Sequence, residues 1–411
     1  MRRMTDAFER LFSPARLGAL TLRNRVLRTA CFEGLSAGGA PGDALIEHHR
    51  RVAAGGTAMT TLAYCAVSPD GRTFDTQILM DERASGGLSR LTAAVHAEGG
   101  AASIQLGHSG DFASKAVAGS APMGPSRRFN LYGLALSRAM TGDDIARVVE
   151  AFGRAAGLAA RCGFDAIELH AGHGYLLSQF LSPHTNRRSD AYGGSPENRL
   201  RFPLAALAAA KAAAGPGVPV LVKMNLEDAA RGGLRVDDAV GIARAFEAAG
   251  ADALVLSGGF VSARSCLYML RGGVPTREMA RGQPGLLRKA GLLLFGRVFV
   301  ARTPYEELFF LEDARKVRAA VRLPLVLLGG VASRGAMTRA LDAGFEFVAL
   351  GRALVRDPEF TGKVRDGLAA ASDCDHCNRC VAEMASTGVR CVCLEKRGVL
   401  FSHASGRAGP Q

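Results

Sequence analysis

Short apolar runs recur along this 411-residue chain, and several of them follow an alanine-rich stretch that ends in glycine. Glycine commonly ends a helix because it adopts positive φ without a Cβ clash. Within the runs, apolar and polar residues do not alternate, which is typical of parallel strands buried on both faces. Five runs of this kind predict strands over residues 59–64, 101–106, 164–169, 252–256 and 345–350.

Three further apolar runs fill the gaps in this series, over residues 25–29, 218–224 and 324–328. Eight strands that alternate with helices over roughly 350 residues predict an α/β protein, a (β/α)8 TIM barrel. The alternative is a doubly wound sheet, which would carry a G-x-G-x-x-G turn directly after a strand. No such turn follows a predicted strand, so the barrel is favoured.

One large domain with a short appendage accounts for the length of the chain. We expect the barrel over residues 8–370, a cysteine-rich segment over 371–395 and a disordered tail over 396–411. The longest irregular region lies between the sixth and seventh strands, from about Gly258 to Arg302. A long loop in a compact domain is more often a functional lid than an accident.

Composition narrows the class of protein further. Hydrophobic residues make up 48% of the chain, which is enough for a sizeable core. No uncharged apolar stretch reaches the length of about eighteen residues that a membrane-spanning helix needs. The N-terminus lacks the apolar segment of a secretory signal. We therefore expect a cytoplasmic protein with no membrane partner.

The formal net charge of +13 raises the question of nucleic-acid binding. The basic residues are scattered, and only Arg277, Arg281, Arg288 and Lys289 are loosely clustered. An arginine-rich surface explains the charge, and attraction of an anionic ligand such as a phosphate cofactor is the next explanation. We expect no nucleic-acid partner.

The fourth predicted strand ends in two histidines and a tyrosine set among glycines: His170, His173 and Tyr175. In barrels, catalytic side chains lie at the carboxyl ends of strands, on loops held by a rigid scaffold. Histidine can donate a hydrogen bond to a developing negative charge, and a phenol keeps its proton at neutral pH. The loop then enters a helix, with Ser195 as N-cap and Pro196 at the first helical position.

This part of the chain resembles the Old Yellow Enzyme family of FMN-dependent oxidoreductases. The resemblance rests on HAGHGYLLSQFLSP, NRRSD and YGGSPENR, which lie between His170 and Arg199. Shorter matching pieces are Asn24–Val26, Ser103–Gly110, Gly329–Val331 and Gly351 with Arg352. The resemblance covers about residues 10 to 393 and implies a barrel that binds FMN and accepts electrons from NAD(P)H.

The resemblance implies an ene-reductase, which transfers hydride to the β-carbon of an α,β-unsaturated carbonyl compound. His170 and His173 would bind the carbonyl oxygen of this small-molecule substrate, and Tyr175 would protonate its α-carbon. Some relatives vary at the tyrosine and take the proton from water. Loss of Tyr175 would then slow the reaction rather than abolish it.

The resemblance also assigns residues to the flavin ring. Lys223 ends an apolar strand, where a charge is costly unless it has a partner, and the family places a cation beside flavin N1. Gln105 offers an amide to the pyrimidine edge of the flavin. The implied ring contacts are Thr29, Ala30, Tyr64, Gln105, His170 and Lys223.

Two glycine-containing strand ends would hold the FMN phosphate. They are Gly329 with Gly330 after the seventh strand, and Gly351 with Arg352 after the eighth. Glycines let backbone N–H groups approach an anion closely, and Arg352 adds a positive charge. Barrels of this class commonly bind phosphate after these two strands.

The loop after the first strand departs from the family pattern. Many relatives place a threonine or a cysteine next to flavin N5, where it tunes the reduction potential. The corresponding residue is Phe32, or Cys31 if the alignment shifts by one position. Redox tuning and substrate choice are therefore expected to differ from those relatives.

Five cysteines lie between Cys374 and Cys393, and their C-x-x-C-x-x-C spacing is typical of a metal site in a reduced compartment. The segment is similar to one in 2,4-dienoyl-CoA reductases and trimethylamine dehydrogenase, which ligates a [4Fe–4S] cluster. The implied ligands are Cys374, Cys377, Cys380 and Cys393. Three interpretations stay open: a cluster served by a separate redox partner, a structural zinc ion, or a motif without metal.

Two alternatives to an ene-reductase follow from the same residues. One is a flavin-dependent dehydrogenase or demethylase of the same fold, which the unusual loop after the first strand favours. The other is a non-catalytic barrel that binds a metal or a partner through its cysteine segment, and it would be colourless. For the enzyme we expect a homo-oligomer.

Overall fold

Eight parallel strands close into a barrel, which confirms the predicted (β/α)8 fold. The computed structural model describes residues 2–36, 38–130, 135–283, 285–384 and 386–395. In order around the barrel, the strands are β3 (Val26–Arg28), β4 (Met59–Ala66), β5 (Ala101–Gly107), β9 (Ala166–Ala171), β10 (Val220–Asn225), β11 (Ala253–Ser257), β12 (Leu325–Leu327) and β13 (Phe347–Leu350).

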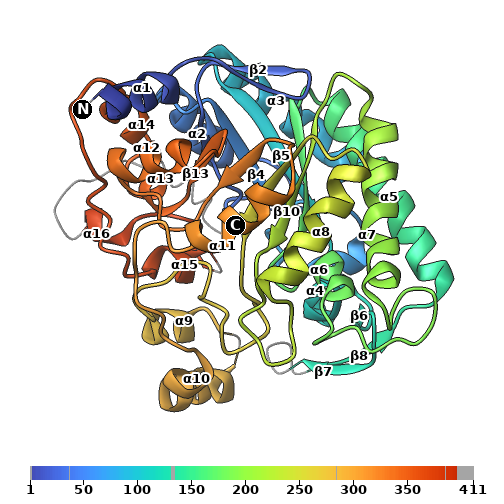
Figure 1. The fold of residues 1–411 in the computed structure, drawn as a ribbon. Helices are drawn as coiled ribbons and strands as arrows, with labels where there is room; N and C mark the ends of the chain where they lie inside the picture. Colours follow the sequence, from blue (N-terminus) through green and yellow to red (C-terminus); the bar gives the residue numbers. More distant parts are fainter. Residues whose placement is uncertain (1, 37, 131–134, 284, 385, 396–411) are drawn as a thin grey trace.

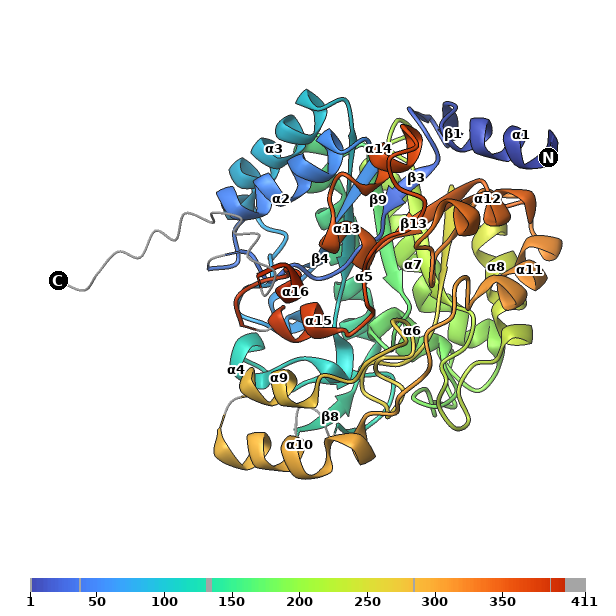
Figure 2. The same cartoon turned by 90° about the vertical axis from the view of Figure 1, so that its left-hand side faces the viewer.

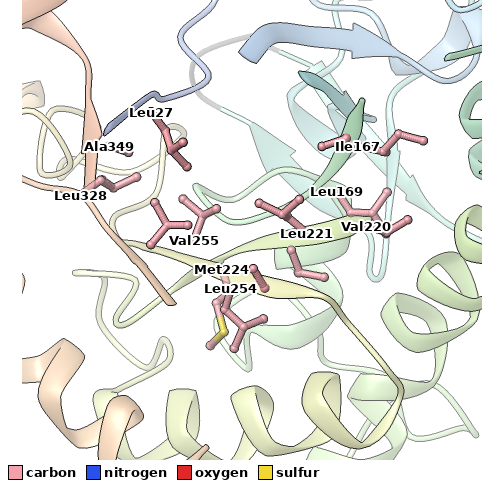
Figure 3. Close-up of a cluster of buried hydrophobic side chains, with 14 of the residues drawn as sticks. Leu27, Ile167, Leu169, Val220, Leu221, Met224, Leu254, Val255, Leu328 and Ala349 are labelled. Carbon is pink, nitrogen blue, oxygen red and sulfur yellow. The ribbon is translucent and has the colours of Figure 1, made fainter. Parts of the chain in front are cut away.

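Every residue of these eight strands is buried, as the unbroken apolar runs predicted. Figure 3 shows Leu27 of β3, Leu169 of β9 and Val255 of β11 gathered in one cluster, although they lie far apart in the sequence. All eight predicted strands exist, and their ends differ from the predictions by at most two residues. Strand β9, for example, begins at Ala166, and just before it the Asp165 carboxylate accepts a hydrogen bond from Ala102 N at 2.7 Å.

Helices connect the strands and cover the outside of the barrel (Figure 1). The helix after β9 begins as predicted, since Ser195 Oγ accepts a hydrogen bond from Asn198 N at 3.2 Å and Pro196 is the first helical residue. The connecting helices are α2 (Asp43–Ala54), α3 (Glu82–Ala97), α5 (Gly142–Arg161), α7 (Pro196–Ala214), α8 (Val236–Ala248), α11 (Leu311–Ala320) and α12 (Arg334–Asp342), with α13 (Arg352–Arg356) and α14 (Phe360–Arg365) after the last strand.

Short extra elements lie at the two ends of the barrel. Helix α1 (Arg2–Leu11) and the hairpin of β1 (Ala15–Leu17) and β2 (Leu20–Leu22) precede the first barrel strand and lie at the top of Figure 1. The opposite end carries elements inserted in the loops after the strands: η1 (Pro69–Gly71), η2 (Gly110–Phe112), α4 (Lys115–Ala118), β6 (Met123–Gly124), β7 (Arg128–Asn130), β8 (Ala135–Ala139) and α6 (Leu176–Leu181).

The region from Gly258 to Arg302 is less irregular than its sequence suggested. It contains α9 (Thr276–Arg281) and α10 (Leu286–Phe299), which lie at the lower edge of the molecule in Figures 1 and 2. The residues before α9 pack against the carboxyl end of the barrel. Leu267 is buried there, which gives this part of the loop a fixed place in the structure.

The cysteine-rich segment folds against the same end of the barrel. It contains the short helices α15 (Arg379–Glu383) and α16 (Val392–Glu395), which lie beside α13 in Figure 2. The predicted tail over residues 396–411 lies outside the described residues. Among the helices that the structure describes, none combines the length and the hydropathy needed to cross a lipid bilayer.

Candidate active site

A cavity opens at the carboxyl ends of the barrel strands, where barrels carry their chemistry. The space between its walls is about 1010 Å³, counted out to its open mouth. The structure brings nine of the predicted site residues together around it, from six different strand ends. They are Thr29, Ala30, Tyr64, Gln105, His170, His173, Tyr175, Lys223 and Arg352.

The two histidines are held by different strands. His170 is the fifth residue of β9, and His173 follows in a tight turn with φ of 59°, so the imidazole rings lie 5.0 Å apart at nearly a right angle. Asn225 of β10 accepts a hydrogen bond from His173 N at 2.9 Å, and Ser257 of β11 contacts His173 Nε2 at 2.7 Å. The Ser257 contact engages Nε2, and no hydrogen bond to His173 Nδ1 occurs among the described residues.

Both histidines are uncharged at neutral pH. Burial, and to a smaller extent the nearby Lys223 ammonium, lower the pKa of His173 to about 3. Burial also places the pKa of His170 well below its usual value, and His173 and Lys223 add to this effect. A neutral imidazole keeps one N–H donor, so each ring can donate to an oxygen without carrying a charge.

Glu168 connects the two residues that were assigned to the flavin ring. Its Oε1 accepts a hydrogen bond from Gln105 Nε2 at 2.6 Å and forms an ion pair with Lys223 Nζ at 2.9 Å. Lys223 also donates to Thr29 Oγ1 at 3.1 Å. The side chain of Lys223 is 1% exposed and that of Glu168 is 4% exposed, so each charge depends on the other for compensation.

Aromatic rings form one wall beside the histidines. The Tyr175 ring lies 4.7 Å from the His170 ring and 4.8 Å from the Tyr64 ring. Phe32 also lines the cavity and stacks on Phe74 at 4.9 Å, so the residue that departs from the family pattern has a fixed position. Cys31, the alternative at this position, lines the same cavity.

Only one of the four predicted phosphate-binding residues lines the cavity. Arg352 lines it, whereas Gly329, Gly330 and Gly351 lie at the same rim outside its lining. Gly329 lies so close to the Phe310 ring that a Cβ atom there would be 2.4 Å from it. The role of these three glycines stays a prediction.

The residues at the inner end of this cavity fit a flavin ring. A buried ammonium at Lys223 and a buried amide at Gln105 are aligned by one carboxylate. His170 Nδ1 is buried and has no hydrogen-bond partner among the described residues. A buried polar atom without a hydrogen bond destabilises the folded protein unless a ligand or a water molecule supplies one. At the outer end, Arg352 offers the positive charge that a phosphate requires.

The cysteines line a second, smaller pocket beside this cavity. Cys374, Cys377, Cys380, Cys391 and Cys393 all lie on it. Cys377 Sγ and Cys393 Sγ are 3.7 Å apart, and the carboxylate of Asp375 lies near both. The thiol of Cys391 instead accepts a hydrogen bond from Arg356 at 3.6 Å, which agrees with the choice of Cys393 as the fourth ligand. Among the described residues, Asp375, Cys377 and Cys393 are close enough to share one metal ion, and Cys374 and Cys380 line the same pocket.

Three residues of the site had no role in the sequence analysis. Glu168 gives a local signal, since it is a carboxylate inside an apolar strand, where a charge needs a partner. Asn225 and Ser257 end the next two strands, and strand ends are where such residues would be sought. Their contact with His173 follows from the order of strands around the barrel.

Residues 10–266 match the model of a family described as NADH:flavin oxidoreductase / NADH oxidase. The chain belongs to this family. The resemblance to the Old Yellow Enzyme family is thereby confirmed, and with it flavin-dependent oxidoreduction with NAD(P)H. An NADPH dehydrogenase from Listeria welshimeri, a further relative, is 37% identical over 62% of this chain and 75% of its own length.

One relative matches this chain over almost the full length of both proteins. The 4,4'-dithiodibutanoate disulfide reductase of Rhodococcus erythropolis is 46% identical over 93% of this chain and 94% of its own length. The NADH oxidase of Thermoanaerobacter brockii is 31% identical over 88% of this chain, which spans 51% of that protein.

Solved structures show the same fold. A complex of morphinone reductase with tetrahydroNAD superposes with a TM-score of 0.67, at 25% identity, over 88% of this chain and 92% of that one. A 2-naphthoyl-CoA reductase bound to 2-naphthoyl-CoA superposes with a TM-score of 0.75, at 22% identity, over 92% of this chain and 58% of that one.

Proposed function

We propose that this family member reduces the carbon–carbon double bond of α,β-unsaturated carbonyl compounds with electrons from NAD(P)H. Bound FMN would supply the hydride that is added to the β-carbon. Its ring would be held by Lys223, Gln105 and Thr29, with Ala30, Tyr64 and His170 beside it. The observation that supports the proposal is the neutral histidine pair, 5.0 Å apart, beside Tyr175 and above a buried lysine.

His170 and His173 would activate the substrate by donating hydrogen bonds to its carbonyl oxygen. As electron density moves onto this oxygen during hydride addition, these bonds strengthen, so they stabilise the transition state more than the bound substrate. Ser257 and Asn225 fix His173, which means that no reorganisation is needed at the moment of reaction.

Tyr175 would complete the reaction by donating its phenolic proton to the α-carbon. Its ring lies 4.7 Å from that of His170, so a substrate held by the histidines would have its double bond beside the phenol. Water from the open mouth of the cavity would return the proton to Tyr175 before the next cycle. The phenol therefore speeds the last step without being its only proton source.

The test is an anaerobic two-step experiment. The purified protein is reduced with NADH or NADPH until the flavin absorption is bleached, and cyclohexenone is then added. The proposal expects the absorption to return and one cyclohexanone to form per reduced flavin. Bleaching by NAD(P)H without recovery on cyclohexenone would contradict the ene-reductase proposal and leave the family activity intact.

A second candidate substrate class is organic disulfides, because a relative that is 46% identical over 93% of this chain is named a disulfide reductase. Reduction of one disulfide consumes two electrons and two protons and gives two thiols, and NAD(P)H with one proton supplies both. The same bleached protein would then recover its absorption with 4,4'-dithiodibutanoate and release two thiols per flavin. Recovery with the disulfide alone would favour this candidate over the enone.

For the cysteine segment we propose a [4Fe–4S] cluster held by Cys374, Cys377, Cys380 and Cys393. Iron and acid-labile sulfide, measured on anaerobically purified protein, should each approach four per chain. Zinc at one per chain would identify the structural-zinc alternative, and no metal would contradict both. The homo-oligomer, a separate redox partner and the cytoplasmic location stay predictions.

A further inference from the structure

We propose that Asn378, in the cysteine segment, is a positioning residue that holds Arg352 at the phosphate end of the flavin cavity. Docking of the cysteine segment against the barrel and retention of FMN would then depend on each other. This inference rests on the proposed flavin site and on the assignment of Arg352 to the phosphate. It concerns cofactor binding, so it can be tested without any substrate.

The flavin cavity and the cysteine pocket share a wall. Arg352, Val355 and Cys380 line both of them. The segment also contributes Met384 and Val389 to the flavin cavity, so it forms one side of the site rather than a separate appendage. Any displacement of this segment would therefore open the cavity.

Asn378 is the contact through which the segment reaches Arg352. Its side chain is buried, and its backbone has the left-handed φ of 60°. Asn378 Oδ1 accepts a hydrogen bond from Arg352 Nη1 at 2.6 Å. Asn378 Nδ2 donates to the carbonyl oxygens of Gly273 at 2.9 Å and Arg271 at 3.2 Å. The amide thus joins three segments that are distant in the sequence.

Arg352 is held in one orientation by these neighbours. Besides Asn378, its Nη1 donates to Arg271 O at 2.9 Å, and its Nη2 donates to Leu270 O. A guanidinium carries five N–H donors in one plane, so fixing three bonds leaves the remaining donors with a defined direction. A charge that is fixed before the ligand arrives binds it more tightly, because less conformational freedom is lost on binding.

Close backbone contacts hold the segment in the position that Asn378 requires. Gly34 and Gly272 approach the backbone of the segment so closely that a Cβ atom would lie 2.1 Å from Met384 O and 2.3 Å from His376 O, respectively. Val389 N also donates to Glu33 O at 2.6 Å. With such contacts, the segment docks in one register, and a change at its cysteines is transmitted to Asn378 directly.

The test compares the affinities of the full chain for FMN and for riboflavin, which lacks the phosphate. The variant Asn378→Gly removes the side chain and keeps a residue that tolerates the left-handed backbone. We expect FMN binding to weaken about 10- to 100-fold, because the partly buried Arg352 loses one of the three hydrogen bonds that fix its orientation. Riboflavin binding should change by less than about threefold, since it makes no phosphate contact. Flavin fluorescence on titration of the flavin-free chain gives both dissociation constants.

The matched control is Arg379→Ala, one position further along the segment. Arg379 pairs with Glu278 at 3.2 Å, and no contact between it and Arg352 occurs among the described residues. This variant should keep both affinities. Unchanged FMN binding in Asn378→Gly, or equal losses for FMN and riboflavin, would overturn the inference.

A second variant covers the case in which Asn378→Gly does not fold. Asn378→Asp keeps an oxygen for Arg352 but loses the amide donor and places a negative charge near the phosphate, so the same selective loss of FMN is expected. Cys377→Ala, which loosens the segment from the other side, should also weaken FMN binding more than riboflavin binding. A Cys377→Ala protein that retains FMN like the parent would contradict the coupling.

Discussion

The charge state of the two cavity histidines decides what they can do. Burial and the neighbouring Lys223 keep the pKa of both rings below the physiological range, that of His173 at about 3. Neutral rings donate hydrogen bonds but do not act as strong acids at pH 7. The proton for the product must then come from another group, and Tyr175 is the side chain that the cavity offers beside them.

A first prediction at the residue scale concerns Tyr175→Phe. This substitution keeps the ring in the cavity wall and removes the phenolic proton. Reduction of cyclohexenone should slow by about 10- to 100-fold, at the lower end of what a general acid contributes, because water can replace the phenol. Stopped-flow recovery of flavin absorption after anaerobic reduction measures this step. Tyr192→Phe, outside the cavity, is the control, and equal rates in both variants would exclude Tyr175 as the proton donor.

A second prediction concerns the pH dependence of the same step. Because the pKa of each cavity histidine lies well below 6.5, neither ring should change its charge between pH 5.5 and 8. The rate of enone reduction by the reduced protein should therefore be flat over this range. A decline with a midpoint near 6.5 would show that a histidine titrates and that the rings act in their charged form.

At the scale of elements, three neighbouring strands build the inner end of the site. Gln105 of β5 lies opposite Glu168 of β9, and Lys223 of β10 lies opposite His170 of β9. Parallel register therefore places the amide beside the carboxylate, and it places the ammonium two residues further along, where Lys223 Nζ still reaches Glu168 at 2.9 Å. Since β9 lies between the other two strands, Glu168 is the residue that can reach both.

The prediction at this scale is that Glu168→Gln destabilises the fold. The substitution leaves Lys223 buried without its counter-charge, and breaking one side of a buried ion pair costs about 3–5 kcal/mol. Urea unfolding followed by circular dichroism measures the change in the free energy of unfolding. Asp165→Asn, on the residue just before β9, is the control and should cost about 1 kcal/mol, because it weakens one backbone hydrogen bond and a partly exposed contact with His96. A loss below about 1 kcal/mol in Glu168→Gln would contradict the paired-charge interpretation.

For the whole molecule, buried neutral histidines link stability to pH. His49 is fully buried beside Arg28 and Glu33, and burial together with the Arg28 charge lowers its pKa well below the usual value. In the unfolded chain the same ring takes up a proton near pH 6.5. The unfolded state then binds more protons than the folded state below this pH, so the free energy of unfolding falls as the pH falls.

The corresponding prediction compares the parent with His49→Gln, which cannot titrate. Between pH 7 and pH 5 the parent should lose about 2 kcal/mol more in the free energy of unfolding than the variant does, as expected for one histidine. Urea unfolding of both proteins at several pH values gives the difference. Parallel pH curves would show that the folded protein protonates His49 as readily as the unfolded chain.

Much of the fold could be predicted from the sequence because the patterns that indicate strands and helix ends lie in short stretches of the chain. Burial of a strand on both faces produces a continuous apolar run, and the glycines at residues 163 and 250 do adopt the positive φ expected after a helix. The helices at 276–281 and 286–299 could not be predicted in the same way. Helix α10 exposes several large apolar side chains, Leu294 by 75%, so it lacks the amphipathic pattern of a helix packed on the barrel.

The sequence by itself determined the barrel, the strand that carries the two histidines and the family of the chain, because each depends on residues that are neighbours along the chain. Only the tertiary structure decided that Glu168 joins Lys223 to Gln105 and that Ser257 holds His173. It also decided that the cysteine segment forms a wall of the cavity and reaches Arg352 through Asn378. These contacts join residues on different strands and loops, and closure of the barrel is the physical event that brings them within hydrogen-bonding distance.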